Sequence, residues 1–419
     1  MQFPDIHAVE LWNRIRLRFI ELLRVQATNA RQGMGALLVA SGTNVFAGLT
    51  LGFMTGTLER LPGLIILVPA AIGMRGNIFG ALGSRLGTAM HTGQFTTPIT
   101  RRSAPGQGVA AALVMTLYVS IALAVLAKET ARLFGLETIS MLDYLVISFV
   151  GGILSSAAVL LITIRVAMVS VRRGWDMDNV AAPLVTAAGD LVTLPALWLA
   201  TLLLPIAFVR EIVGIISLGA VIGITVYSFV RLRGLSVYRG IIRQSIPILL
   251  MAGLLDIIAG ITIDRRVDRF FTYPALLVLI PPFLADAGAI GGILSARLSS
   301  KLHLGLVDPK ALPGRRSLED ISLTYVLAIP VFLLVGIGAT LVSSITGLAH
   351  PPWMSMIALS VLAGAMATTA AVFVAYYASV LSYRFGLDPD NYGIPTVTST
   401  MDMTGVLALF LAMVILGIV

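Results

Sequence analysis

One stretch of this sequence occurs twice, first as Asp176-Met-Asp178-Asn179-Val-Ala-Ala-Pro183-Leu-Val185-Thr186-Ala-Ala-Gly-Asp190 and, 212 residues later, as Asp388-Pro-Asp390-Asn391-Tyr-Gly-Ile-Pro395-Thr-Val397-Thr398-Ser-Thr-Met-Asp402. Each copy ends on one aspartate, Asp190 or Asp402, inside an otherwise apolar segment. A carboxylate in a helix that crosses lipid is costly and is rarely kept without a function. The matched pair therefore indicates a pathway for cations.

The composition is that of a polytopic membrane protein. Of 419 residues, 57% are hydrophobic and 12% are charged, with a mean hydropathy of +0.94, whereas soluble proteins carry about 25% charged residues. A spanning helix needs roughly 20 apolar residues, and Gln107–Ala127 is one such run. We predict an all-α fold with eleven spans, at about residues 34–57, 62–84, 107–127, 142–168, 179–209, 211–230, 246–263, 274–294, 319–344, 355–380 and 391–418.

Lysine and arginine are distributed unevenly between the predicted loops. With the N-terminus inside, 21 fall in cytoplasmic segments and 7 in external loops, which follows the positive-inside rule. The net charge of +8 therefore orients the chain at the lipid headgroups, and we do not expect nucleic acid as a partner. We expect an integral protein of the cell (plasma) membrane with a cytoplasmic N-terminus and an external C-terminus. Residues 1–33 are predicted to form an amphipathic segment at the inner surface.

The offset of 212 extends over most of the chain and divides it into two similar halves. Among the residues that match at this offset are Ala47-Gly48 with Ala259-Gly260, Pro62 with Pro274, Pro69 with Pro281, Gly76 with Gly288, Arg85-Leu86 with Arg297-Leu298, Gly152 with Gly364, and Arg172 with Arg384. Five spans are expected in each half, at 34–209 and 235–419. The apolar segment within 210–234 has no counterpart and returns the chain to the inside. Because five is an odd number and the linking span restores the orientation, we predict parallel repeats related by a twofold axis along the membrane normal.

The second and fifth spans resemble a known family. The pattern Pro69-Ala-Ala-Ile-Gly-Met-Arg75-Gly76-Asn77…Ser84-Arg85-Leu86, followed by Pro183-Leu-Val-Thr…Asp190, is similar to the MgtE-type magnesium transporters. The duplicated form, with its linking helix, is most similar to solute carrier family 41. Bacterial members are homodimers of one five-helix unit, so the resemblance implies a chain that functions as a monomer and mimics such a dimer.

The resemblance also implies a metal site. In the family, the aspartate of the fifth helix lines the pore and binds a hydrated Mg²⁺ together with its symmetry mate, and these roles fall on Asp190 and Asp402. A backbone carbonyl one turn earlier contributes, which matches Thr186 and Thr398. No cofactor is implied beyond Mg²⁺ as the transported and bound ion.

This sequence departs from the family pattern in three places. The cytoplasmic regulatory domains of the bacterial members are missing, so a gating mechanism does not carry over. A polar residue before the proline of the fifth helix is replaced by Ala182 and Ile394, and Gly76-Asn77 of the second helix becomes Gly288-Ala289 in the second half.

Further polar residues are candidates for secondary sites. Asp176, Asp178, Asp388 and Asp390 lie at the predicted inner mouth, where they serve as helix N-caps or concentrate cations. Asp256, Asp286 and Asn77 lie within predicted spans, and the positions equivalent to the two aspartates hold Asn44 and Met74. An unpaired arginine in a span is expensive, so we expect Arg75 to pair with a carboxylate, with Asp286 the first choice. Alternatively, Asp256 or Asp286 forms a second cation or proton site for coupled transport.

Several functions remain open at this point. The main hypothesis is transport of Mg²⁺ through a central pore, with a Na⁺- or H⁺-coupled Mg²⁺ exchanger as the alternative. The sequence does not rank Mg²⁺ against Mn²⁺, Co²⁺ or Zn²⁺. A transporter of organic cations lacks an aromatic cage around either aspartate. An intramembrane aspartyl protease is a remote alternative, because Tyr-Asp and Gly-x-Gly-Asp are absent at both aspartates. We therefore do not expect an enzyme.

Overall fold

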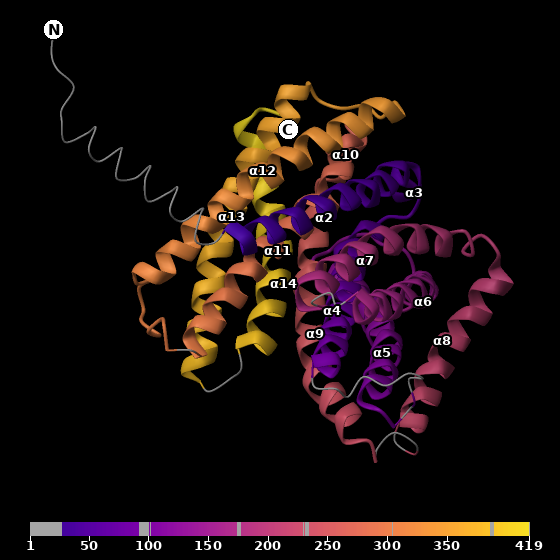
Figure 1. The fold of residues 1–419 in the computed structure, drawn as a ribbon. Coiled ribbons are helices and arrows are strands. Elements are labelled where there is room, and N and C mark those ends of the chain that lie inside the picture. The colour runs from indigo at the N-terminus through magenta and orange to yellow at the C-terminus, as the bar shows by residue number, and fades with distance from the viewer. Residues whose placement is uncertain are drawn as a thin grey trace, which may run out of the picture.

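The computed structural model describes residues 27–91, 100, 102–173, 177–228, 230, 234–303, 305–385 and 389–418. Within these residues the regular structure is helical throughout, as predicted, and no strand is present. Figure 1 shows the helices, which are α2 (Ala27–Phe53), α3 (Thr55–Arg60), α4 (Leu64–His91), α5 (Ala104–Leu133), α6 (Met141–Arg173), α7 (Met177–Thr201), α8 (Ala207–Tyr227), α9 (Ser236–Asp264), α10 (Val267–Thr272), α11 (Ala275–His303), α12 (Arg315–Thr346), α13 (Trp353–Arg384) and α14 (Pro389–Ile415). The predicted amphipathic segment at 1–33 lies almost entirely outside the described residues.

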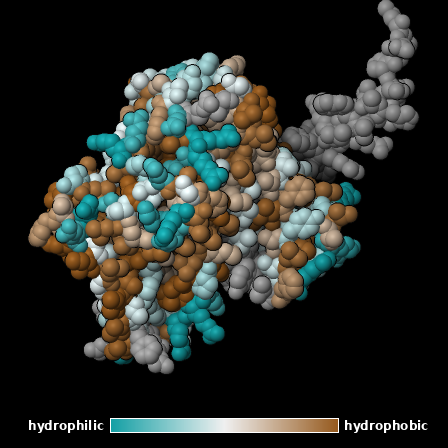
Figure 2. Space-filling view, turned by 180° about the vertical axis from the view of Figure 1, so that it is seen from behind, coloured by the Kyte–Doolittle hydropathy of each residue, from teal (hydrophilic) through white to brown (hydrophobic). Residues whose placement is uncertain are grey.

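Ten of the described helices are long and apolar enough to cross a membrane. The first predicted span, 34–57, corresponds to the apolar stretch Leu37–Phe53 of α2, which falls short of that length among the described residues. Large hydrophobic side chains cover much of the surface, and Phe208, Ile215 and Ile222 of α8 are exposed. Figure 2 shows broad hydrophobic areas interrupted by groups of hydrophilic side chains. Such a surface suits a lipid environment and not water.

The end of the fifth predicted span is wrong by eight residues. We expected a span over 179–209, but α7 ends at Thr201 and α8 begins at Ala207. Turn hydrogen bonds from Leu203 and Leu204 to carbonyls of the last turn of α7 close the helix. Pro205 follows directly, and a proline disfavours helical backbone in the residue before it.

The first helix of each half packs against the other half. α2 lies along α11 and α12, while α9 lies along α4 and α5. These contacts are close because they occur at glycines: a Cβ on Gly48 would overlap the carbonyl oxygen of Val278, and a Cβ on Gly260 would overlap that of Ile66. Both pairs are related by the same offset of 212 residues. The first helices are therefore exchanged between the two halves.

The remaining helices pack in matching ways within each half. Ser148 of α6 donates a hydrogen bond to the carbonyl of Ser120 on α5 at 2.5 Å, and Ser360 of α13 donates to the carbonyl of Phe332 on α12 at 2.7 Å. In Figure 1 the indigo-to-magenta helices α4–α7 lie on one side and the orange-to-yellow helices α12–α14 on the other. α8 lies outside, against α6 and α5, where Arg210 pairs with Asp143 at 3.6 Å.

Candidate functional site

The two aspartates that end the repeated stretch lie in the helix interior of α7 and α14. Asp190 is 2% exposed, and Asp402 is half-buried. Asp190 lies close enough to Asp402 and Asp286 for their charges to interact. α7 packs against α2 and α4 of its own half, and α14 packs against α9 and α11 of its own half. The two halves meet at the aspartates, because Asp402 and Asp286 interact with Asp190 and Gly73 of α4 lies beside Asp402. The structure thus brings Asp190, Asp286 and Asp402 into one region.

One turn before each aspartate, a threonine packs against a glycine on the second long helix of the same half. A Cβ on Gly76 of α4 would lie 3.3 Å from the methyl carbon of Thr186, and a Cβ on Gly288 of α11 would lie 3.7 Å from Thr398. These two glycines allow the fifth helix of each half to approach the second. The helix position of Thr186 and Thr398 is thereby fixed beside the aspartates.

Asp402 meets a second carboxylate, that of Asp256 on α9. The two side chains interact with each other, and the hydroxyl of Ser399 also interacts with Asp256, although neither oxygen of Asp256 has a hydrogen bond of normal geometry. A Cβ on Gly73 of α4 would lie 2.8 Å from Oδ2 of Asp256 and 3.5 Å from Oδ2 of Asp402. Gly73 therefore leaves the space in which the two carboxylates converge.

The first half presents a different group to its own aspartate. Asn44 of α2 occupies the position equivalent to Asp256, and its side chain faces Asp190. Asp286 of α11 faces the hydroxyl of Ser41, also on α2. Each aspartate of α7 and α14 is thus paired with a polar residue of an exchanged first helix, but only the second half pairs acid with acid.

These carboxylates lack the partners that buried charges normally have. Within the described residues, no lysine, arginine or histidine contributes to the charge environment of Asp190, Asp256, Asp286 or Asp402. Oδ2 of Asp190, Oδ2 of Asp286 and both oxygens of Asp256 are buried without a hydrogen bond of normal geometry. A buried ionised carboxylate without a partner is strongly unfavourable. Such carboxylates need a proton or a bound cation to offset their charge.

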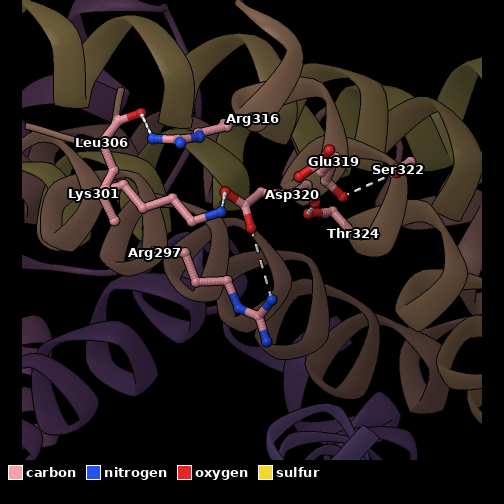
Figure 3. A network of polar contacts seen from close by, with 8 residues as sticks. All are labelled: Arg297, Lys301, Leu306, Arg316, Glu319, Asp320, Ser322 and Thr324. Carbon is pink, nitrogen blue, oxygen red and sulfur yellow. Dashed lines mark hydrogen bonds and ion pairs between the residues drawn. The ribbon is translucent and has the colours of Figure 1, made fainter. Parts of the chain in front are cut away.

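Asp320, near the start of α12, shows the contrast. It is 1% exposed, and Figure 3 shows Lys301 and Arg297 of α11 directed toward its carboxylate, at 2.6 Å and 3.9 Å. Its backbone carbonyl accepts a hydrogen bond from Thr324. This buried carboxylate, which the sequence analysis did not identify, is compensated by two basic side chains and links α11 to α12.

Arg75 does not form the predicted pair with Asp286. Its Nε donates a hydrogen bond to the hydroxyl of Ser155 on α6 at 3.1 Å, and its Nη1 donates to the carbonyl of Ala71 at 3.1 Å. Its Nη2 is buried without a partner, next to Gly152, and no carboxylate of the described residues lies within ion-pairing distance. The small residues Gly152 and Ser155 give the guanidinium a place against α6.

The remaining predicted residues are Asn77 and the four aspartates of the predicted inner mouth. Asn77 is half-buried on α4 beside Gly76. Asp178 and Asp390 fall in the first turns of α7 and α14, but their side chains, like Asp176 and Asp388 altogether, lie outside the described residues. In the described part of the chain, no group of three or more His, Asp or Glu side chains is arranged to hold a metal directly.

The roles of Gly73, Ser399 and Ser41 were not anticipated from sequence. The signal available for them was the offset of 212 itself, because Gly73 matches Ala285 and Asp256 matches Asn44. Both of these positions differ between the halves, and knowing that they are in contact would have drawn attention to them. Without the packing of α9 on α4, however, these positions had no visible connection.

Comparison with known proteins finds one matching family and several relatives. The sequence pattern of the MgtE family, described as divalent cation transporter, matches the chain twice, at residues 68–200 and 280–412. "Solute carrier family 41 member 2" of Xenopus laevis is 26% identical over 411 residues, covering 91% of this chain and 71% of the relative. "Solute carrier family 41 member 3" of Rattus norvegicus is 23% identical over 383 residues, covering 85% and 81%.

Among solved structures, the crystal structure of MATE in complex with Br-NRF aligns over 93% of this chain and 98% of that chain, at 14% identity and a TM-score of 0.32. A similarity at that level carries no argument about the fold. The two matches to the MgtE pattern are the same distance apart as the two aspartates, and they confirm the predicted resemblance. The chain is an integral membrane protein and a transporter, not an enzyme, and it belongs to the MgtE family of divalent cation transporters.

Proposed function

We propose that this transporter carries Mg²⁺ across the cell membrane through a path between its two halves, with Asp190 and Asp402 as the opposed ligands of a hydrated ion. The observation that supports this most strongly is the set of buried carboxylate oxygens without basic partners in the described residues. Four carboxylates against the single guanidinium of Arg75 give this interior an excess of negative charge. A divalent cation offsets most of it.

The proposed path requires two parallel repeats, at 34–209 and 235–419, with α8 as the linking span. The packing supports this arrangement, because the Gly48–Val278 and Gly260–Ile66 contacts are equivalent. Reciprocal contacts of this kind are those of a twofold interface, in which residue i meets j and j meets i. With the twofold along the membrane normal, one chain suffices for function as a monomer, and the N-terminus is cytoplasmic and the C-terminus external.

The depth of the aspartates suits such a path. Asp190 lies thirteen residues after the start of α7, and Asp402 thirteen after the start of α14. At about 1.5 Å per residue, both lie roughly 20 Å along their helices, within the hydrocarbon core of about 30 Å. Mg²⁺ releases its waters reluctantly and is usually bound through one or two carboxylates with several waters retained. The carbonyls of Thr186 and Thr398, one turn earlier, would contact the same water shell.

The test is Mg²⁺ flux into proteoliposomes at a clamped membrane potential, without Na⁺ or pH gradients. The combined Asp190→Asn and Asp402→Asn variant keeps the size of both side chains and removes both charges, so we expect it to insert normally and to lose flux. Asp268→Asn, a similar change on α10 outside the predicted path, serves as the matched control. Wild-type flux that persists in the double variant would overturn the proposed ligands. Flux that requires an imposed Na⁺ or proton gradient would identify an exchanger.

A further inference from the structure

Asp256 breaks the symmetry between the two halves. It is fully buried on α9, and neither of its carboxylate oxygens has a hydrogen bond of normal geometry. Its Oδ2 points to the same place as Oδ2 of Asp402, since a Cβ on Gly73 would lie 2.8 Å from the first and 3.5 Å from the second. A buried, unpartnered carboxylate is thus aimed directly at another carboxylate.

The equivalent contact between the halves, of α2 with α11, lacks both features of this arrangement. The position equivalent to Asp256 is Asn44, and the position equivalent to Gly73 is Ala285. The acid and the space therefore occur together where α9 meets α4, and the amide and the methyl group occur together where α2 meets α11. Because the two positions lie on different helices, their joint change suggests that Gly73 makes room for whatever Asp256 and Asp402 hold.

Among the residues that the structure describes, none supplies positive charge to this pair. From α14, Asp402 and the hydroxyl of Ser399 face Asp256, and beyond them Asp190 contributes further negative charge. On α4, Arg75 directs its guanidinium to Ser155 of α6. On α5, Lys128 donates hydrogen bonds to Thr138 and Ile139. Two ionised carboxylates in this position repel each other, and either a shared proton or a bound cation relieves the repulsion.

We propose that Asp256 and Asp402, with the hydroxyl of Ser399, form a second divalent-cation site that adjoins the Asp190–Asp402 site and shares Asp402 with it. The proposal rests on the proposed function, because the ion is the transported cation. Carboxylate and hydroxyl oxygens are suitable ligands for hard divalent cations such as Mg²⁺ and Mn²⁺. The convergence of both carboxylates favours direct coordination here, in contrast to the hydrated ion expected between Asp190 and Asp402.

Sharing Asp402 gives the second site a role in transport. One divalent ion leaves the interior with a net charge of −1, if Asp190, Asp256, Asp286 and Asp402 are ionised beside Arg75, and a second ion changes this to +1. The second ion is therefore bound less tightly and weakens the first through their common ligand. Conduction needs ions bound strongly enough to be taken up and weakly enough to leave, which adjacent sites provide.

The experiment measures the number of bound Mn²⁺ ions per chain by electron paramagnetic resonance, on the full chain in nanodiscs at fixed pH. Asp256→Asn should bind one ion fewer than wild type, and it should fold, because the equivalent position naturally holds Asn44. Asp286→Asn is the matched control, since it removes one buried negative charge from the same cluster but not from this pair. It should keep the wild-type number of ions with weaker affinity for each.

A gain of binding gives an independent test. The combined Asn44→Asp and Ala285→Gly variant builds the same arrangement beside Asp190, and it should bind one ion more than wild type. An unchanged number in Asp256→Asn, or an equal loss in Asp286→Asn, would overturn the second site. Asp190→Asn reports separately on the proposed function: if it loses no ion while Asp256→Asn does, the Asp190–Asp402 site fails and the Asp256–Asp402 site stands.

Discussion

The exchange of first helices between the halves depends on two glycines, and replacing one of them gives a sharp prediction. Gly48→Ala places a methyl group against the carbonyl oxygen of Val278, and neither backbone can move aside without separating α2 from α11. Overpacking of this kind costs about 1–3 kcal/mol. An alanine in a helix interior is otherwise better than glycine by about 1 kcal/mol, so the net destabilisation is smaller than the clash alone.

A control on the same helix separates the two effects. Gly42 has no atom within 4 Å of the position that a Cβ would occupy, so Gly42→Ala should gain only the helix preference. The difference in free energy of unfolding between Gly48→Ala and Gly42→Ala should therefore equal the overpacking cost of about 1–3 kcal/mol. Thermal unfolding in detergent, monitored by the loss of the monodisperse peak in gel filtration, compares the stability of the two variants.

The second half should repeat this result. Gly260→Ala meets the carbonyl of Ile66, and Gly240, on the same helix α9, is free of neighbours within 4 Å. We expect the pair Gly260→Ala and Gly240→Ala to differ by a similar amount. If Gly48→Ala is as stable as Gly42→Ala, the close approach of α2 to α11 does not exist. If only one half responds, the contacts are not equivalent and the pseudo-twofold arrangement fails.

Three more predictions concern the site and its supports. Gly76→Ala should reduce Mg²⁺ flux, because its methyl group presses on Thr186 at 3.3 Å. Gly80→Ala meets Thr186 at an ordinary 3.7 Å and should transport normally. Equal flux in the two variants would contradict this prediction. Arg75→Met removes the buried positive charge of the span, so Mg²⁺ should bind more tightly in a titration, and weaker binding would show that the guanidinium supports the site. Asp320→Asn leaves two basic side chains without their acidic partner. It should lower stability by about 1–3 kcal/mol, since both partners are partly exposed and are screened by solvent, and an unchanged melting temperature would refute the role of the network.

Much of the architecture could be predicted from sequence because membrane helices follow a few strong rules. The hydropathy of the chain gave the all-helical membrane fold, and the residues of the second and fifth spans gave the family. The roles of Asp190 and Asp402 stay predictions. The break between α7 and α8 was misplaced although Pro205 marked it, because the apolar run continues across the proline and hydropathy alone does not end a helix.

The contacts between helices of different halves could not be predicted. Arg75 was expected to find a carboxylate, since an unpaired charge in a span is costly, but small residues on α6 give its guanidinium hydroxyl and carbonyl partners instead. The convergence of Asp256 and Asp402 at Gly73 depends on the exchange of α2 and α9, and no periodicity along the chain reports that exchange. Asp320 was overlooked because it lies at the charged start of the predicted span 319–344, where an acidic residue is ordinary.

The opposed aspartates are tested most directly by locating the ion. Crystals grown with Mn²⁺ and measured at an X-ray energy where manganese scatters anomalously would show its position without reference to transport. We expect an anomalous peak between Asp190 and Asp402, at a distance that leaves room for water, and its loss in the Asp190→Asn and Asp402→Asn double variant. A map with manganese elsewhere in the protein and none between these two carboxylates would contradict the proposed ion path.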